Sequence, residues 1–154
     1  MNRKEYLTHS REGTIRLGAR LAGHLQAGDI ICLFGDLGSG KTTFTKGIAK
    51  GLRIKESRVN SPSFILMNQY NGKLPLFHFD FYRIDNAKEV FSIGCEEFLY
   101  DDGVAVVEWA ERLGKLLPKN HLAVQFSCKK ENERLIKFIP RGRRAGEMIK
   151  QFAP

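Results

Sequence analysis

The chain has 154 residues, of which 42% are hydrophobic, and its formal net charge at pH 7 is +8. This composition is typical of one folded domain with a hydrophobic core, and it excludes an intrinsically disordered chain. No apolar run approaches the ~20 residues of a membrane span, and the charged N-terminus lacks the apolar stretch of a secretory signal, so we expect a cytoplasmic protein without membrane contact.

The N-terminal third predicts a helix, a buried strand and a second helix. Ser10 is a suitable N-cap for the first helix, whose apolar stripe continues to about Gln26, and Gly28 follows its end. The apolar residues 29–34 are typical of a buried strand. A second helical pattern then covers 41–52.

The middle of the chain predicts a loop followed by a hairpin. Residues 57–63 contain Ser-Pro-Ser and are expected to form a loop. Strands are predicted at 64–70 and 74–80. Asn71-Gly72, a strong hairpin turn signal, lies between them, so we expect the two strands to pair antiparallel.

The remainder of the chain continues the alternation of helices and strands. The predicted elements are a helical segment at 86–99 interrupted by Gly94, a strand at 103–107, a helix at 109–117 ended by Pro118, and a hairpin of strands 122–128 and 134–139. A mixed sheet covered by helices is the natural architecture for this order of elements.

Residues 35–42 read Gly-Asp-Leu-Gly-Ser-Gly-Lys-Thr and match the phosphate-binding pattern G-x-x-x-x-G-K-[ST] between a strand and a helix. The glycines let successive N–H groups point into one concavity at a helix N-terminus, which favours a polyphosphate. Lys41 adds a point charge for the β- and γ-phosphates, and the Thr42 hydroxyl can ligate Mg²⁺. The sequence therefore predicts a nucleotide site in an α/β fold, a P-loop NTPase-like three-layer sandwich with a mixed β-sheet.

Such a site also needs an acid at the end of a neighbouring strand and a group that positions the attacking nucleophile. Glu108 directly follows an apolar strand, the arrangement expected of a metal-side acid, and Asp80 ends another strand. The alternative for both acids is a capping or ion-pairing role. We expect His78 to face the core or to form a local hydrogen bond, with a role as a base as the alternative. Trp109 is expected either to stack on a base or a partner or to pack at a helix start.

The positive charge is concentrated at the C-terminal end. Residues 119–154 carry nine Lys/Arg against three Asp/Glu, whereas residues 1–118 carry sixteen against fourteen. We interpret 1–154 as a single domain with a basic C-terminal segment at about 129–154. This segment contacts RNA, an acidic partner or nucleotide phosphates, or it forms a solvated face.

Four blocks of the sequence, together with Thr14 and its neighbours in the first helix, resemble the TsaE family. The blocks are Gly-Asp-Leu-Gly-Ser-Gly-Lys-Thr-Thr-Phe from Gly35, Ser-Pro-Ser-Phe from Ser61, His-Phe-Asp-Phe-Tyr-Arg from His78 and Glu-Trp from Glu108. They occur in the family's order and span roughly residues 14–118. Two positions depart mildly from the family pattern, because Ser63 replaces the usual Thr and Ser39 replaces a common Ala.

The resemblance implies a small bacterial ATPase required for threonylcarbamoyladenosine (t6A) at position 37 of certain tRNAs. It implies that the chain acts with TsaB and TsaD, that TsaD performs the transfer to tRNA, and that tRNA contact is indirect, through the complex. The implied ATP-binding residues are Thr14, Gly38, Ser39, Gly40, Lys41, Thr42 and Thr43. Thr42 and Glu108 would hold Mg²⁺, Asp80 and Lys41 would support hydrolysis, and residues 61–64 would form a switch-like loop.

Two other functions remain open from the sequence. One is a small-molecule kinase in which Arg141, Arg143 and Arg144 form a lid over the phosphates. The other is a basic RNA-binding module that uses nucleotide only structurally, with salt-sensitive RNA affinity and no hydrolysis.

Overall fold

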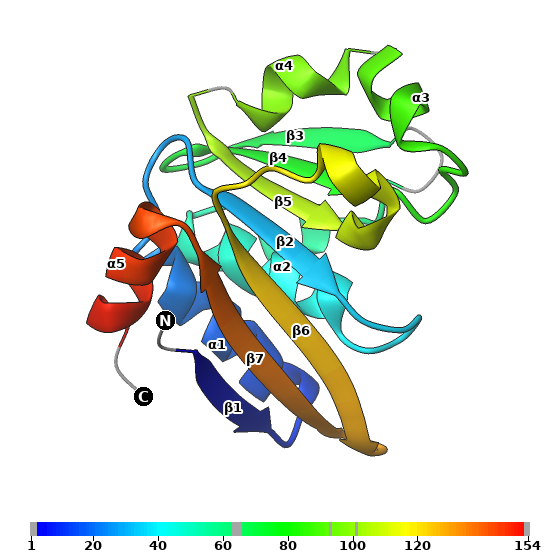
Figure 1. The fold of residues 1–154 in the computed structure, drawn as a ribbon. Helices are drawn as coiled ribbons and strands as arrows, with labels where there is room; N and C mark the ends of the chain where they lie inside the picture. Colours follow the sequence, from blue (N-terminus) through cyan, green and yellow to red (C-terminus); the bar gives the residue numbers. More distant parts are fainter. Residues whose placement is uncertain (1–2, 63–65, 93, 101, 153–154) are drawn as a thin grey trace.

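The computed structural model describes residues 3–62, 66–92, 94–100 and 102–152. Seven strands in these residues form one sheet in the order β1-β7-β6-β2-β5-β4-β3 (Figure 1). The four central strands are mutually parallel, and they are β6 (His121–Lys130), β2 (Ile30–Phe34), β5 (Val104–Glu108) and β4 (Pro75–Asp80). Three antiparallel strands complete the sheet, and they are β7 (Glu133–Arg141), β1 (Lys4–Thr8) and β3 (Met67–Asn71).

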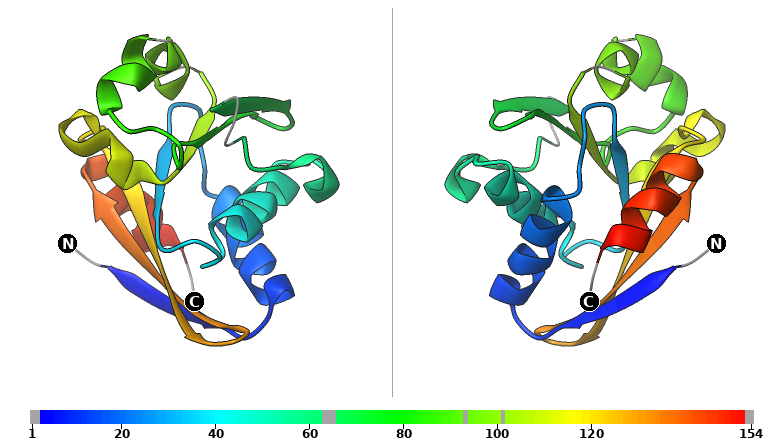
Figure 2. Two further views of the ribbon diagram at one scale, coloured as in Figure 1. Left: turned by 90° about the vertical axis from the view of Figure 1, so that its right-hand side faces the viewer. Right: turned by 90° about the vertical axis from the view of Figure 1, so that its left-hand side faces the viewer.

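Helices cover both faces of the central strands (Figure 2). The helices on one face are α1 (Arg11–Ala22), α2 (Lys41–Gly51) and α5 (Arg143–Gln151), which share the larger hydrophobic core. The helices on the other face are α3 (Ala87–Ser92), α4 (Cys95–Leu99) and the 3₁₀ helix η2 (Ala110–Leu116). A short 3₁₀ helix, η1 (Glu56–Arg58), follows α2. No helix in the described residues is long and apolar enough to cross a bilayer.

The third layer covers only part of the sheet. Residues of β1 and β7, and those of β6 from Gln125 onward, stay partly or fully accessible where they point away from α1. Glu5 and Leu7 are exposed there, and the ammonium of Lys137 lies 3.7 Å from the Glu5 carboxylate. The predicted three-layer sandwich with a mixed sheet is therefore confirmed, with its third layer over β2, β5 and β4.

Two glycines let α1 and α2 pack in close contact. A Cβ atom added at Gly18 would lie 2.5 Å from the Phe44 carbonyl oxygen, and one at Gly47 would lie 2.2 Å from the Ile15 carbonyl oxygen. Any larger residue would force the helices apart. This contact fixes the first turn of α1, which carries Thr14, against the start of α2.

Most of the predicted elements are present. The Ser10 hydroxyl accepts a hydrogen bond from the N–H of Gly13 at 3.0 Å, so Ser10 caps α1. The β3–β4 hairpin is antiparallel as expected. Gly94, with φ of 84°, separates α3 from α4. The C-terminal hairpin of β6 and β7 is also confirmed and is longer than predicted.

Some predictions of element boundaries and helix type were wrong, and two elements were missed. The first helix ends at Ala22 rather than near Gln26. The segment predicted as an ordinary helix at 109–117 is a 3₁₀ helix, because Gly114 adopts φ of 51° and breaks the α-helical geometry. Strand β1 and helix α5 were not predicted. Helix α5 is strongly amphipathic, but its positive charge led us to interpret it as part of a basic segment. Ser63 and Phe64 lie outside the described residues.

Candidate nucleotide-binding site

The site lies where three parallel strands end at the same edge of the sheet. The P-loop, residues 35–42, follows β2, Glu108 ends β5 and Asp80 ends β4. The register pairs Leu33 with Glu108 on one side and Asp80 with Glu108 on the other. The carboxyl edge of a parallel sheet is the usual place for ligands in α/β proteins, because loops from neighbouring strands meet there.

Glycines give the P-loop its shape. Gly38 and Gly40 adopt φ of 77° and 109°, values that residues with a side chain rarely adopt. At Gly35, with φ of 155°, a Cβ would come within 2.6 Å of the Ser39 hydroxyl and 3.0 Å of Phe126. Gly40 precedes α2 and provides no side-chain cap, so the first N–H groups of the helix face the loop and are suited to an anion.

The Lys41 ammonium lies inside this loop. It donates hydrogen bonds to the carbonyl of Asp36, at 2.9 Å, and to that of Gly35. It also lies 4.0 Å from the centroid of the Trp109 ring, a cation–π contact. Burial lowers the pKa of Lys41, and nearby carboxylates, led by Glu108, act in the opposite direction. The ammonium is therefore held in place by carbonyls and a ring before any phosphate is present.

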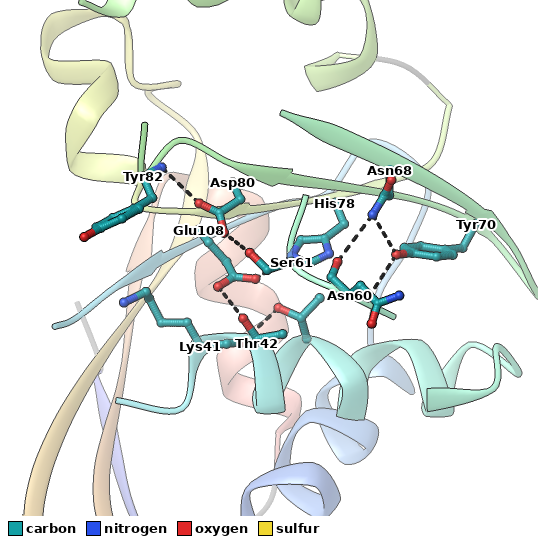
Figure 3. A network of polar contacts seen from close by, with 11 residues as sticks. Lys41, Thr42, Asn60, Ser61, Asn68, Tyr70, His78, Asp80, Tyr82 and Glu108 are labelled. Atoms are coloured by element: carbon teal, nitrogen blue, oxygen red, sulfur yellow. Dashed lines mark hydrogen bonds and ion pairs between the residues drawn. The ribbon is translucent and has the colours of Figure 1, made fainter. Parts of the chain in front are cut away.

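A chain of three side chains crosses the floor of the site (Figure 3). The Thr42 hydroxyl donates to Oε1 of Glu108 at 2.8 Å. Oε2 of Glu108 lies 2.5 Å from Nε2 of His78, whose side chain is completely buried. Thr42 is the last residue of the P-loop motif, so the Glu108 carboxylate lies where a metal-side acid is required.

Asp80 makes a separate set of contacts. Its Oδ1 accepts a hydrogen bond from the backbone N–H of Tyr82 at 2.9 Å, and its Oδ2 accepts one from the Ser61 hydroxyl. The Tyr82 ring lies 4.9 Å from the Trp109 ring, centroid to centroid. Trp109 has φ of 57°, uncommon for a residue with a large side chain, and it directly follows Glu108. Asp80, Tyr82 and Trp109 thus form one wall of the site.

The edge strand β3 holds the loop that carries Ser61. The backbone N–H of Asn60 donates to the Tyr70 hydroxyl at 3.3 Å, and the Asn68 amide donates to the Asn60 carbonyl at 3.3 Å. The Asn68 amide also donates to the Tyr70 hydroxyl at 3.1 Å. Figure 3 shows this group, which we call the Asn60 clasp (Asn60, Asn68 and Tyr70), beside the contact of Ser61 with Asp80.

These elements surround a pocket of about 430 Å³. The described residues that line it are Ser10, Arg11, Thr14, Leu37, Gly38, Gly40, Lys41, Thr42, Thr43, Ser61, Asp80, Tyr82, Glu108, Trp109, Asn132 and Arg134. The set includes every predicted site residue except Ser39. The Ser39 side chain is buried against Gly35, so only its backbone is suited to contact a ligand. Arg83, for which the sequence left open a γ-phosphate contact or a structural salt bridge, is exposed and is not among the described lining residues.

Four lining residues lie outside the site motifs recognised in the sequence. Ser10 and Arg11 come from the start of α1, Asn132 comes from the turn between β6 and β7, and Arg134 lies at the start of β7. Arg134 lies against the P-loop, with its guanidinium 3.5 Å from the Gly38 carbonyl oxygen. The turn reaches the pocket because β6 extends beyond the end of β2, and no local sequence signal reports how far a strand extends past its neighbour.

The C-terminal arginines proposed as a lid lie at the other end of the molecule. The Arg144 guanidinium donates two hydrogen bonds to the Asp29 carboxylate, at 3.0 and 2.9 Å, and one to the His24 carbonyl at 2.7 Å. Asp29 precedes β2, whereas the P-loop follows it, so the strand separates Arg144 from the pocket. Arg143 pairs with Glu147, 3.2 Å away. The prediction that these residues form a lid over the phosphates is therefore wrong.

A mixed α/β sheet with a glycine-rich phosphate-binding loop after a central parallel strand defines a protein of P-loop-like fold. The family described as "Threonylcarbamoyl adenosine biosynthesis protein TsaE" matches residues 8–136. This chain therefore belongs to the TsaE family.

Individual relatives are similar over most of their length. A protein of Bacillus subtilis named tRNA threonylcarbamoyladenosine biosynthesis protein TsaE is 39% identical over 145 residues, which is 94% of this chain and 90% of the relative. The protein of the same name from Treponema pallidum is 37% identical, over 84% of this chain and 96% of the relative. The crystal structure of Bacillus subtilis YdiB has a TM-score of 0.83 at 34% identity, and the match covers 98% of this chain and 94% of that one.

The residues present fit a magnesium–nucleotide pair. Mg²⁺ prefers oxygen ligands, keeps several waters and is usually held by one or two protein groups together with substrate phosphates. Thr42 and Glu108 offer such oxygens side by side at the start of α2, where the P-loop would bring phosphates.

Proposed function

We propose that this chain binds MgATP and hydrolyses it to ADP and phosphate. The observation that carries the proposal is the contact of Thr42 with Glu108 at the edge of a pocket also lined by Lys41 and Asp80. In this arrangement the P-loop N–H groups and Lys41 hold the β- and γ-phosphates, while Thr42 and Glu108 hold the metal ion. Asp80 positions the water that attacks the γ-phosphorus.

The hydrolysis serves t6A modification of tRNA, in a complex with TsaB and TsaD in the cytoplasm. Support comes from the family match over residues 8–136 and from the names of the relatives from Bacillus subtilis and Treponema pallidum. TsaD performs the transfer to tRNA, and this chain contacts tRNA only through the complex.

Hydrolysis by the isolated chain is slow because Asp80 is already engaged. Its Oδ1 accepts from the Tyr82 N–H, and its Oδ2 accepts from the Ser61 hydroxyl. A carboxylate oxygen can accept two hydrogen bonds, and in our proposal the Ser61 hydroxyl competes with the attacking water for Oδ2 until Ser61 moves. Docking on TsaB–TsaD supplies this movement by displacing the loop 57–62.

The test is steady-state phosphate release by the isolated chain, then with TsaB and TsaD, then with tRNA added. We expect slow release by the isolated chain and an increase when both partners are present. Lys41→Ala in the same complex is the matched control and should release no phosphate above background. Full activity of the isolated chain, unchanged by the partners, would contradict the partner dependence. Absence of ATP binding would contradict the whole proposal.

A further inference from the structure

We propose that His78 is a positioning residue that holds the Glu108 carboxylate in the orientation required for Mg²⁺. The inference rests on the proposed binding of MgATP, and it concerns a residue that would not touch the metal ion or the nucleotide itself. From the sequence, His78 was expected in the core or in a local hydrogen bond, with a role as a base as the alternative. The structure shows which group it contacts.

The place of His78 in the sheet is unusual for a polar residue. It lies on β4 in register with Val106 of β5, and its side chain is completely buried. Leu76 and Val104, the neighbouring residues on the same face of these strands, belong to the larger hydrophobic core. An imidazole in such a position costs free energy unless its polar atoms find partners.

One nitrogen of His78 has a partner and the other has none. Nε2 lies 2.5 Å from Oε2 of Glu108, whereas the buried Nδ1 has no hydrogen-bond partner among the described residues. A carboxylate can only accept, so Nε2 is the nitrogen that carries the hydrogen. With the hydrogen on Nε2, Nδ1 carries a lone pair and leaves no donor unpaired. The contact with Glu108 is thus the polar contact that accounts for a histidine at this position.

The two contacts of Glu108 act on different oxygens. Thr42 donates to Oε1 and His78 donates to Oε2, so the plane of the carboxylate is fixed from both sides (Figure 3). A glutamate held only by Thr42 would sample other orientations, and Mg²⁺ binding would have to restrict them. Partners that orient a metal ligand are typically worth about 10- to 100-fold in metal affinity.

The test compares His78→Asn with His78→Gln. A glutamine places its amide nitrogen as many bonds from Cα as Nε2 of histidine, so it can still donate to Oε2 of Glu108, whereas asparagine is one bond shorter. ADP affinity is measured calorimetrically in EDTA and across a Mg²⁺ titration. We expect His78→Asn to raise the half-effective Mg²⁺ concentration by about tenfold, with ADP affinity in EDTA unchanged. His78→Gln should stay within about threefold of the wild type.

His121→Gln is the matched control. His121 is the other buried histidine in the described residues, and it lies at the start of β6, away from the pocket. Its substitution should leave the Mg²⁺ dependence unchanged. In a Glu108→Gln background, His78→Asn should have no further effect, because the oriented carboxylate is already gone.

Two results would overturn the inference. One is a wild-type Mg²⁺ dependence of His78→Asn. The other is equal impairment of the asparagine and glutamine variants, which would indicate a packing role. If the ADP affinity of the wild-type protein does not depend on Mg²⁺, the proposed metal site is refuted instead. Should the asparagine variant fail to fold, ¹⁵N NMR of wild-type His78 identifies which ring nitrogen carries the hydrogen. A hydrogen on Nδ1 and none on Nε2 would contradict the contact with Glu108.

Discussion

Asp80 and Glu108 are paired residues on the adjacent parallel strands β4 and β5, yet their carboxylates contact different partners. Glu108 contacts Thr42 and His78, beneath the P-loop. Asp80 contacts Ser61 and the backbone of Tyr82, on the loop side of the pocket. Two neighbouring acids thus face the two ends of the proposed reaction, the metal ion and the attacking water.

This division predicts opposite effects for the two acids. Glu108→Gln should raise the Mg²⁺ concentration needed for nucleotide binding by about tenfold or more, because it removes a charged oxygen ligand. Asp80→Ala should leave nucleotide affinity within a few-fold and reduce turnover by about 100-fold, the low end for loss of a group that acts on the nucleophile. Calorimetric binding and phosphate release in the TsaB–TsaD complex measure the two effects. The reverse pattern would exchange the two roles.

Lys41→Ala should weaken ATP and ADP binding by roughly 30- to 100-fold while the fold is retained, because charge-assisted hydrogen bonds to phosphate are lost. Trp109, the only tryptophan of the chain, contacts the Lys41 ammonium, so its fluorescence in the nucleotide-free protein should also change. Lys46→Ala, a lysine on α2 that does not belong to the described pocket lining, is the control. Equal nucleotide affinity of wild type and Lys41→Ala would refute the P-loop assignment.

The Asn60 clasp predicts the behaviour of the loop 57–62. Tyr70→Phe removes the hydroxyl that accepts from the Asn60 N–H, so amide hydrogen exchange in this loop should rise about two- to tenfold, the equivalent of one hydrogen bond. Because Ser61 then leaves Asp80 more readily, partner-independent phosphate release should increase as well.

Tyr100→Phe provides the control for Tyr70→Phe, since Tyr100 is an exposed tyrosine at the end of α4 and does not belong to the clasp. Ser61→Ala should raise partner-independent release without the clasp being altered, and adding Tyr70→Phe should then have little further effect. Faster exchange in Tyr70→Phe with unchanged phosphate release would contradict the role assigned to Ser61.

Arg144 and Arg143 should differ sharply although they are adjacent. Arg144→Gln should lower the free energy of unfolding by about 2 kcal/mol, since it leaves the buried Asp29 carboxylate without its main partner. Arg143→Gln should change it by less than about 0.5 kcal/mol, because its pair with Glu147 is solvent-exposed. Chemical denaturation measures both. Neither variant should alter nucleotide affinity. A large loss of affinity in either variant would support the hypothesis of an arginine lid.

His121 predicts a pH dependence of stability. Burial lowers the pKa of His121 below its ordinary value of 6.5, and the nearby Arg141 lowers it further, although the hydrogen bond to the Pro118 carbonyl acts in the opposite direction. The unfolded chain therefore binds this proton more readily than the folded one. The stabilisation is complete above pH 6.5 and declines as the pH falls through the lowered folded pKa. Denaturation between pH 7.5 and about 5 should show a shallower decline for His121→Gln than for the wild type.

Local sequence patterns were sufficient to predict those features that depend only on residues close together in the chain. The glycines and Lys41 of the P-loop and the Ser10 cap are defined by chemistry that acts over one turn of backbone. The Asn71-Gly72 signal predicted the hairpin but not its turn, because Asn71 pairs with Pro75 and residues 72–74 form the connection. Glu108 and Asp80 were recognised because a charged residue at the end of an apolar strand is costly without a function or a partner.

The sequence by itself determined the phosphate loop, the order of most elements and the two acids at the strand ends. Only the tertiary structure decided that β4 pairs with β5 in a register that places His78 behind Glu108, and that the start of β7 brings Arg134 to Gly38. It also decided that Arg144 lies beyond the opposite end of β2. The physical reason is that period-two alternation fixes which face of a strand is buried, whereas register and strand order arise from hydrogen-bond ladders between residues far apart in the chain.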